Sequence, residues 1–331
     1  ESEQAQRNPS RLVEGCQLAV ESLRHNSTFE GNLALRRVIK RLPRPINRFE
    51  HNGRAIYVAF SQDGTRIATA DSMKNVRIWE LSTGIELSKM KFNGSWLIWD
   101  SEYYPSNPVS ISPDFTKVAA IFYRNKLVVL DALSGKELLR MTLENQPNSV
   151  VFSPNSTRIA ITNRGTKGTA RIYDVSSGGK VTSVEHNHTV ISAAFNHEGT
   201  KLATTSYGNA KIWDASTGLE LVKLQLNEIV YSVAFSPDDK KIATVSQGNT
   251  VIWDASTGRE LARFKEGAYS VTFNPNGTRV ATTGLDHTAN IFDIENIIDL
   301  ARLAHNSNVN SVAFSPDGKN LATASDDRTV R

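Results

Sequence analysis

The chain has 331 residues, a net charge of +4 and a single cysteine, which excludes an internal disulfide and suits a reducing compartment. No apolar run approaches the roughly 18 residues that a membrane span requires, and no signal peptide opens the sequence. These features predict a soluble, cytoplasmic protein that does not insert into a membrane.

Residues 1–45 are predicted to form a helical hairpin. Asn8 followed by Pro9 has the form of a helix cap and first helical position. Ser27 and Glu30 match a capping box at the start of a second helix. Because two short helices are marginal alone, we expect the hairpin to pack against the rest of the chain or against upstream sequence.

From residue 46 onward, one sequence unit repeats. The clearest copy begins at Tyr231 and reads YSVAFSPDDKKIATVSQGNTVIWDASTGREL, which predicts short strands separated by tight turns. The position of Phe235 recurs 38 to 51 residues apart, at Phe60, Ile111, Phe152, Phe195, Phe273 and Phe314. One four-stranded sheet cannot bury both of its apolar faces, so the units must pack against one another.

An aromatic residue or Leu followed by an acid ends the third strand of each of the first six units. The pairs are Trp79-Glu80, Leu130-Asp131, Tyr173-Asp174, Trp213-Asp214, Trp253-Asp254 and Phe292-Asp293. This pattern resembles WD40 repeats, over about residues 46–331. The resemblance implies an all-β fold, a seven-bladed WD40 β-propeller preceded by the helical hairpin.

The two ends of the repeat region are expected to meet. Residues 44–50, RPINRFE, are similar to the fourth strand of the later repeats, which in WD40 rings completes the last blade. The seventh repeat stops at Arg331, within its third strand. Either the sequence is cut short or the natural chain continues.

The second repeat carries an insertion, NGSWLIWDSEYYPSNP. It places Trp96, Trp99, Tyr103 and Tyr104 in one loop, on the narrow face where WD40 proteins commonly bind partners. Trp and Tyr dominate interface hot spots, so this loop is a candidate partner site. The alternative is that the aromatic side chains pack beneath the insertion as a small separate core.

Register assigns two further sets of residues to the same face. Side chains four positions before each anchor are expected at the mouth of the central channel, namely Ile56, Asn107, Asn148, Ile191, Tyr231, Tyr269 and Asn310. Turns between second and third strands are expected to add Arg124, Arg164, Lys167, Tyr207, Gln247 and Asp286. This composition suits a peptide or protein segment better than a polyanion, although an ordinary solvated rim would also fit.

WD40 blades often contain a His and an Asp that join a hydrogen-bond network with the Trp. The resemblance implies this structural role for His51, His186, His305, Asp286 and Asp327. Only the seventh repeat is expected to contain both members, His305 with Asp327.

No catalytic, metal or cofactor site is predicted. His186 and His188 are too few ligands for zinc, and nucleophile and Walker motifs are absent. Residues 165–168 contain two glycines but are followed by a strand rather than the helix that a phosphate loop requires.

The sequence therefore predicts a non-catalytic scaffold that binds a protein or peptide, which could be another domain of the same polypeptide. The repeats also resemble the C-terminal WD40 portion of prokaryotic multidomain signalling proteins, which implies a sensor domain beside an NTPase, protease or kinase. Two alternatives stay open: an enzyme with a site at the channel mouth, and nucleic-acid binding through the basic helices of residues 1–45. Charges that are adjacent on a helix, such as Arg36-Arg37 and Lys40-Arg41, diverge around it, which favours a solvated face over the latter alternative.

Overall fold

The computed structural model describes residues 46–92, 108–122, 124–284 and 286–331, so the expected helical hairpin and the insertion aromatics lie outside the described residues. Every regular element in these ranges is a β-strand, and the predicted all-β fold is confirmed. None of the described residues forms a helix long and apolar enough to cross a membrane.

The described strands form seven antiparallel units of four, which we call blades 1 to 7; β17 contributes to two of them. Blade 1 contains β2 (Ala55–Phe60), β3 (Arg66–Asp71), β4 (Asn75–Glu80) and β5 (Glu86–Lys91). Blade 2 contains β6 (Val109–Ile111), β7 (Lys117–Phe122), β8 (Lys126–Asp131) and β9 (Glu137–Thr142). Blade 3 contains β10 (Pro147–Phe152), β11 (Arg158–Asn163), β12 (Gly168–Asp174) and β13 (Lys180–His186).

The remaining blades follow the same order. Blade 4 contains β14 (Ala193–Phe195), β15 (Lys201–Thr205), β16 (Tyr207–Asp214) and the first part of β17 (Glu220–Phe235). Blade 5 contains the rest of β17, then β18 (Lys241–Ser246), β19 (Thr250–Asp254) and β20 (Glu260–Phe264). Blade 6 contains β21 (Ala268–Phe273), β22 (Arg279–Gly284), β23 (Thr288–Asp293) and β24 (Ile298–Ala304). Blade 7 contains β25 (Val309–Phe314), β26 (Leu321–Ser325), β27 (Thr329–Val330) and β1 (Phe49–Glu50).

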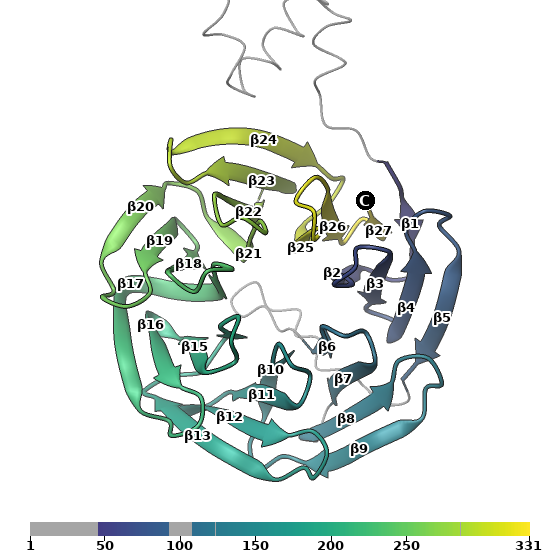
Figure 1. The fold of residues 1–331 in the computed structure, drawn as a ribbon, viewed down its shortest axis with the longest axis horizontal. Coiled ribbons are helices and arrows are strands. Elements are labelled where there is room, and N and C mark those ends of the chain that lie inside the picture. The colour runs from purple at the N-terminus through teal and green to yellow at the C-terminus, as the bar shows by residue number, and fades with distance from the viewer. Residues whose placement is uncertain (1–45, 93–107, 123, 285) are drawn as a thin grey trace, which may run out of the picture.

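The blades are arranged in a ring, with their first strands nearest the centre and their fourth strands at the rim (Figure 1). Each first strand contacts the first strand of the next blade, and β25 contacts β2, which closes the circle. At this closure β1 pairs antiparallel with β27, with Phe49 opposite Val330. The two ends of the described chain therefore share one sheet.

The hydrophobic core lies between neighbouring blades rather than within one. Ile78 and Met90 of blade 1 share a buried cluster with Val118 of blade 2, and Ile212 of blade 4 shares another with Ile242 of blade 5. Accordingly, second strands such as β11 are buried on both faces, whereas β9 at the rim is mostly exposed. This burial pattern is the physical reason why no blade could fold alone.

The repeated aspartates cap turns. Asp254 Oδ1 accepts hydrogen bonds from the hydroxyls and backbone N–H groups of Ser256 and Thr257. These bonds hold the pKa of the Asp254 carboxyl well below its usual value. Asp174 and Asp214 make the same set of bonds in their own blades. Their regular repetition therefore reflects turn structure.

Candidate binding face

The connections between blades and the turns between second and third strands lie at the same end of the ring. Backbone hydrogen bonds join the two sets: Ser72 N donates to Arg54 O at 2.8 Å, and Asp326 N donates to Asn308 O at 2.9 Å. We call this end the loop face. It is the face to which the sequence assigned its candidate binding residues.

The residues that lie four positions before each anchor, predicted at the channel mouth, form contacts between neighbouring blades. We call them the channel row. Asn148 Nδ2 of blade 3 donates to Ile191 O of blade 4 at 2.7 Å. Asn310 Nδ2 of blade 7 donates to Ala55 O of blade 1 at 2.8 Å. The same register position thus recurs as a contact across the blade boundary, which gives this row a structural role around the channel.

The other members of the row are apolar or aromatic, except Asn107, which lies outside the described residues. The rings of Tyr231 and Tyr269 lie 5.3 Å apart between blades 5 and 6. Ile56 packs against the cluster between blades 1 and 2. These contacts also cross from one blade to the next.

The predicted turn residues differ in how much of their surface is free. Arg164 Nε donates to Asn148 Oδ1 at 2.9 Å, and Asp286 Oδ2 lies 3.3 Å from Arg302 Nη1. Arg124 is exposed and has a φ of 63°. Tyr207 keeps 52% of its surface exposed, so it is the large aromatic residue of this set that remains available to a partner.

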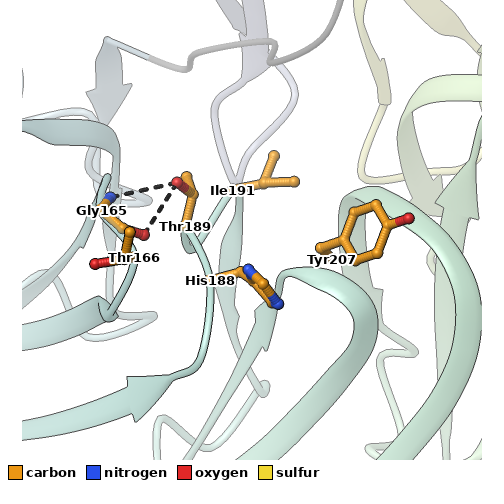
Figure 2. A pocket seen from close by; sticks show the side chains of 6 residues that line it. All are labelled: Gly165, Thr166, His188, Thr189, Ile191 and Tyr207. Atoms are coloured by element: carbon orange, nitrogen blue, oxygen red, sulfur yellow. Dashed lines mark hydrogen bonds between the residues drawn. The ribbon is translucent and has the colours of Figure 1, made fainter.

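A pocket of about 560 Å³ opens on the loop face between blades 3 and 4. It is lined by Gly165, Thr166, His188, Thr189, Ile191 and Tyr207. Figure 2 shows Gly165, Thr166 and Thr189 on one side and Tyr207 on the other, with His188 and Ile191 between them in this view. Sequence analysis assigned two of these residues, Ile191 and Tyr207, to this face.

Local sequence explains why the pocket walls are held in place. Thr189 Oγ1 accepts a hydrogen bond from Gly165 N at 3.3 Å and donates to Gly165 O at 3.4 Å. Ser206 Oγ donates to Thr189 O at 2.9 Å. A Cβ added at Gly168 would lie 2.1 Å from His188 O, so only glycine permits this close approach of the two backbones. Three separate segments are thereby fixed around one opening.

The pocket combines an aromatic wall with hydroxyl groups. The rings of His188 and Tyr207 meet edge to face at a centroid distance of 5.7 Å. Ile191 is only 1% exposed and forms an apolar floor. None of the six described lining residues is a carboxylate. Such a site can hold an apolar or aromatic group and orient it with a few hydrogen bonds.

The other four lining residues, Gly165, Thr166, His188 and Thr189, were not predicted from sequence. The sequence indicates neither a metal site at His186–His188 nor a phosphate site at residues 165–168, and it does not show that these two segments lie together. The available signal was Gly168 at the start of a strand, because such a glycine often marks a close backbone approach.

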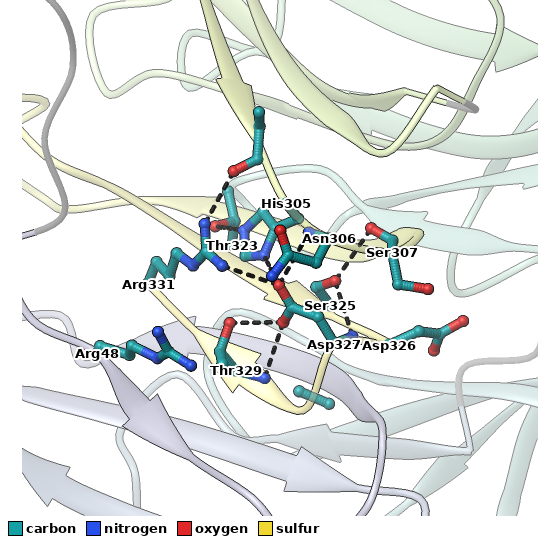
Figure 3. Close-up of polar contacts among 12 residues, drawn as sticks. Arg48, His305, Asn306, Ser307, Thr323, Ser325, Asp326, Asp327, Thr329 and Arg331 are labelled. Carbon is teal, nitrogen blue, oxygen red and sulfur yellow. Dashed lines mark hydrogen bonds and ion pairs between the residues drawn. The ribbon is translucent and has the colours of Figure 1, made fainter.

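The seventh blade contains the predicted histidine–aspartate pair (Figure 3). His305 Nδ1 lies 3.0 Å from Asp327 Oδ2, and His305 Nε2 lies 2.7 Å from Thr323 Oγ1. Although burial would raise it, hydrogen bonds from Thr329, Asn306 and His305 lower the pKa of Asp327 to about 2. Burial lowers the pKa of His305. Since the carboxylate can only accept, His305 carries its proton on Nδ1 and accepts from Thr323 at Nε2.

The first blade also has such a pair, which corrects the expectation that only the seventh does. His51 Nδ1 lies 3.4 Å from Asp71 Oδ2, and Trp79 Nε1 donates to Thr69 Oγ1 at 2.9 Å. Asp71 does not follow the repeat pattern, because it lies at the end of β3, two positions before the turn position that Asp327 occupies in its own repeat. Its carboxylate still reaches the histidine because it folds back over the turn, where it accepts from Met73 N and Asn75 N.

His186 ends β13 of blade 3 and contacts blade 4. Its Nε2 lies 2.7 Å from Thr204 Oγ1, and Trp213 Nε1 donates to the same oxygen at 2.7 Å. Burial and the positive charge of Lys211 lower the pKa of His186 to about 4. Asp286, the remaining predicted member, contacts Thr288 and Arg302 in blade 6. A histidine partner was expected for Asp327 alone, so these contacts leave the structural role of Asp286 a prediction.

Within the described ranges, no group of three or more His, Cys, Asp or Glu residues is arranged to hold a metal ion.

Comparison with known families identifies WD40 repeats. The family described as "WD domain, G-beta repeat" matches residues 179–214, 222–254, 258–293 and 299–331. Each matched segment contains a fourth strand followed by the first three strands of the next blade, so the sequence repeat is offset from the blade. Blades 1 to 3 lie almost wholly outside the matched segments, yet they have the same four-stranded organisation.

Curated relatives are similar over short stretches. Protein hir1 of Schizosaccharomyces pombe is 39% identical over 77 residues, which cover 19% of this chain and 8% of the relative. Protein HIR1 of Yarrowia lipolytica is 36% identical over 88 residues, with 19% and 8% covered. Protein HIR1 of Cryptococcus neoformans is 34% identical over 79 residues, with 20% and 9% covered. The matched region thus spans less than a tenth of each relative.

Proposed function

We propose that this chain is a non-catalytic scaffold that binds a protein or peptide on its loop face, at the pocket between blades 3 and 4. WD40 repeats generally mediate protein–protein interactions, and four are present in residues 179–331. The observation that carries the proposal is a concave site on a rigid ring, lined by Tyr207, which is 52% exposed. Loops held by a rigid scaffold are frequent positions for recognition.

Binding explains the chemistry of the pocket better than catalysis does. A hydrolytic site needs a nucleophile beside a base, or converging acids. In this pocket the hydroxyl of Thr189 bonds to the backbone of Gly165, and the described lining contains no carboxylate. The lining therefore offers contact surface and orientation, which are the requirements of recognition.

The scaffold is further proposed to be the sensor part of a larger signalling protein, with another domain of the same polypeptide as one possible partner. The support is the resemblance of its regular SPDG and WDASTG repeats to those of prokaryotic multidomain proteins. Sequencing the complete gene tests this part: an NTPase, protease or kinase domain encoded upstream would support it. A complete gene encoding this chain alone would contradict it.

A peptide selection tests the binding proposal. Short random peptides displayed on phage are selected on the purified chain, synthesised, and tested for binding by fluorescence anisotropy. Amide hydrogen exchange then locates the site. The expected result is protection in residues 163–168, 187–192 and 206–209. Protection confined to the turns at the opposite end of the ring, or failure to select any binder, would contradict the proposal.

A further inference from the structure

The pocket between blades 3 and 4 has two unlike sides, and this asymmetry indicates its ligand. On one side the ring of Tyr207 is half exposed and meets the exposed ring of His188 edge to face at 5.7 Å. Aromatic rings prefer further rings in offset or edge-to-face positions, with about 0.5–1.5 kcal/mol gained beyond area burial. The volume of about 560 Å³ also falls within the range of sites that bind small organic groups.

The opposite side lies next to basic residues in the sequence. Its lining residues, Gly165 and Thr166, are flanked in sequence by Arg164 and Lys167. Lys167 is exposed, and none of the ion pairs found among the described residues involves it. Because the pocket lining contains no carboxylate, an acidic group placed beside Lys167 would be attracted to its ammonium group without displacing a carboxylate of the lining.

The geometry points to a partner segment with an aromatic side chain that enters the pocket beside Tyr207, and an acidic residue next to it that faces Lys167. This inference rests on the proposed function and names the ligand chemistry of that site. The aromatic ring would pack against the rings of Tyr207 and His188 and displace water from their exposed surface. The acidic residue would remain near solvent at the rim, so its contribution is smaller than that of the ring.

The test uses the peptides selected on the full chain. We expect them to share an aromatic residue with an Asp or Glu beside it, and we expect Tyr207→Ala to weaken their binding about tenfold. Tyr207→Phe keeps the ring and should bind within about twofold of the parent. Leu219→Ala is the matched control, because Leu219 is 64% exposed in a turn at the other end of the ring.

A charge swap tests the second half of the inference. Lys167→Glu should weaken binding roughly threefold, and a peptide whose acidic residue is replaced by Lys should recover that loss with the variant protein. Lys223→Glu, an exposed lysine on the rim strand β17, should leave binding unchanged.

The outcomes separate this inference from the broader proposal. Peptides that protect the loop face but lack an aromatic residue, or that bind Tyr207→Ala as tightly as the parent, would overturn the inference and leave the binding scaffold intact. Peptides that carry the aromatic residue but bind Lys167→Glu as tightly as the parent would overturn the assignment of the acidic residue to Lys167. Peptides that protect only the opposite end would overturn both.

Discussion

Blade 4 is joined to its two neighbours in different ways. From blade 3 the chain leaves β13 at His186, runs through residues 187–192, and enters β14, a strand of only three residues. To blade 5 it passes without interruption along the 16 residues of β17. The first junction contains the pocket. At the second junction, side-chain carboxylates accept hydrogen bonds from turns of the neighbouring blade.

The contacts at the second junction show how it is filled. On the loop face the carboxylate of Glu228 accepts from Gly248 N at 3.1 Å and from Asn249 Nδ2. At the opposite end Asp239 accepts from Asn196 Nδ2 and from His197 N, both at 2.8 Å. The loop that joins blades 3 and 4 therefore leaves space for a ligand. The continuous strand β17 instead brings Glu228 within hydrogen-bond distance of the turn that contains Gly248 and Asn249.

The largest expected effect on stability comes from a substitution at Gly168, in the junction between blades 3 and 4. Gly168→Ala places a methyl group 2.1 Å from His188 O. Because the methyl group would meet backbone rather than a flexible side chain, we expect a loss of about 3 kcal/mol of unfolding free energy. Urea denaturation measures it. Gly84→Ala is the matched control, because no atom lies within 4 Å of its added Cβ and only its φ of +71° is strained, at about 1 kcal/mol. Equal losses for both variants would contradict the close approach.

Acid should weaken the blade 3–4 junction through His186. Its pKa is lowered from 6.5 to about 4 in the folded chain, so the unfolded chain binds a proton where the folded one does not. The free energy of unfolding should therefore be highest above pH 6.5 and fall as the pH decreases towards 4, by about 3 kcal/mol. The urea midpoint of unfolding should change less with pH in His186→Gln than in the parent protein across this range. An unchanged slope would show that His186 is not the responsible group.

The continuous junction should depend on Asp239. This residue has a φ of 58°, a conformation that glycine adopts more easily. Asp239→Gly relieves that strain but removes the bonds to Asn196 and His197, so we expect a net loss of about 1 kcal/mol. Ser156→Gly is the contrasting control, because Ser156 has a φ of 59° and a buried hydroxyl without a partner in the described structure. The midpoint of thermal unfolding should fall for Asp239→Gly and rise for Ser156→Gly. A rise for both variants would contradict a stabilising role for the hydrogen bonds of Asp239.

The smallest expected effect is at Glu228. Glu228→Ala frees the N–H of Gly248 and the amide of Asn249, both of which water can reach, so the loss should be about 0.5 kcal/mol. Urea denaturation measures this loss. Glu185→Ala is the control, because Glu185 is an exposed carboxylate on β13. A loss of several kcal/mol would mean that this junction depends on one carboxylate rather than on its shared strand.

Several features of these junctions could be predicted from sequence. The anchor at Phe235 and its counterparts correctly placed the first strand of each blade, because strand alternation and turn residues are local properties. Register also placed Asn148 and Asn310 near the channel. Their partners, Ile191 O and Ala55 O, belong to other blades and could not be derived from the repeat. Asp71 was missed because a carboxylate can reach one histidine from two different backbone positions.

The strand period, the turn chemistry and the need for each sheet to pack on its neighbours follow from the residues within one repeat. The position of the pocket follows from the packing of blades 3 and 4. Gly165, Thr189 and Tyr207 are distant in sequence and meet only when blades 3 and 4 are packed. A pocket is a property of the space between repeats, and that space depends on how two sheets are joined.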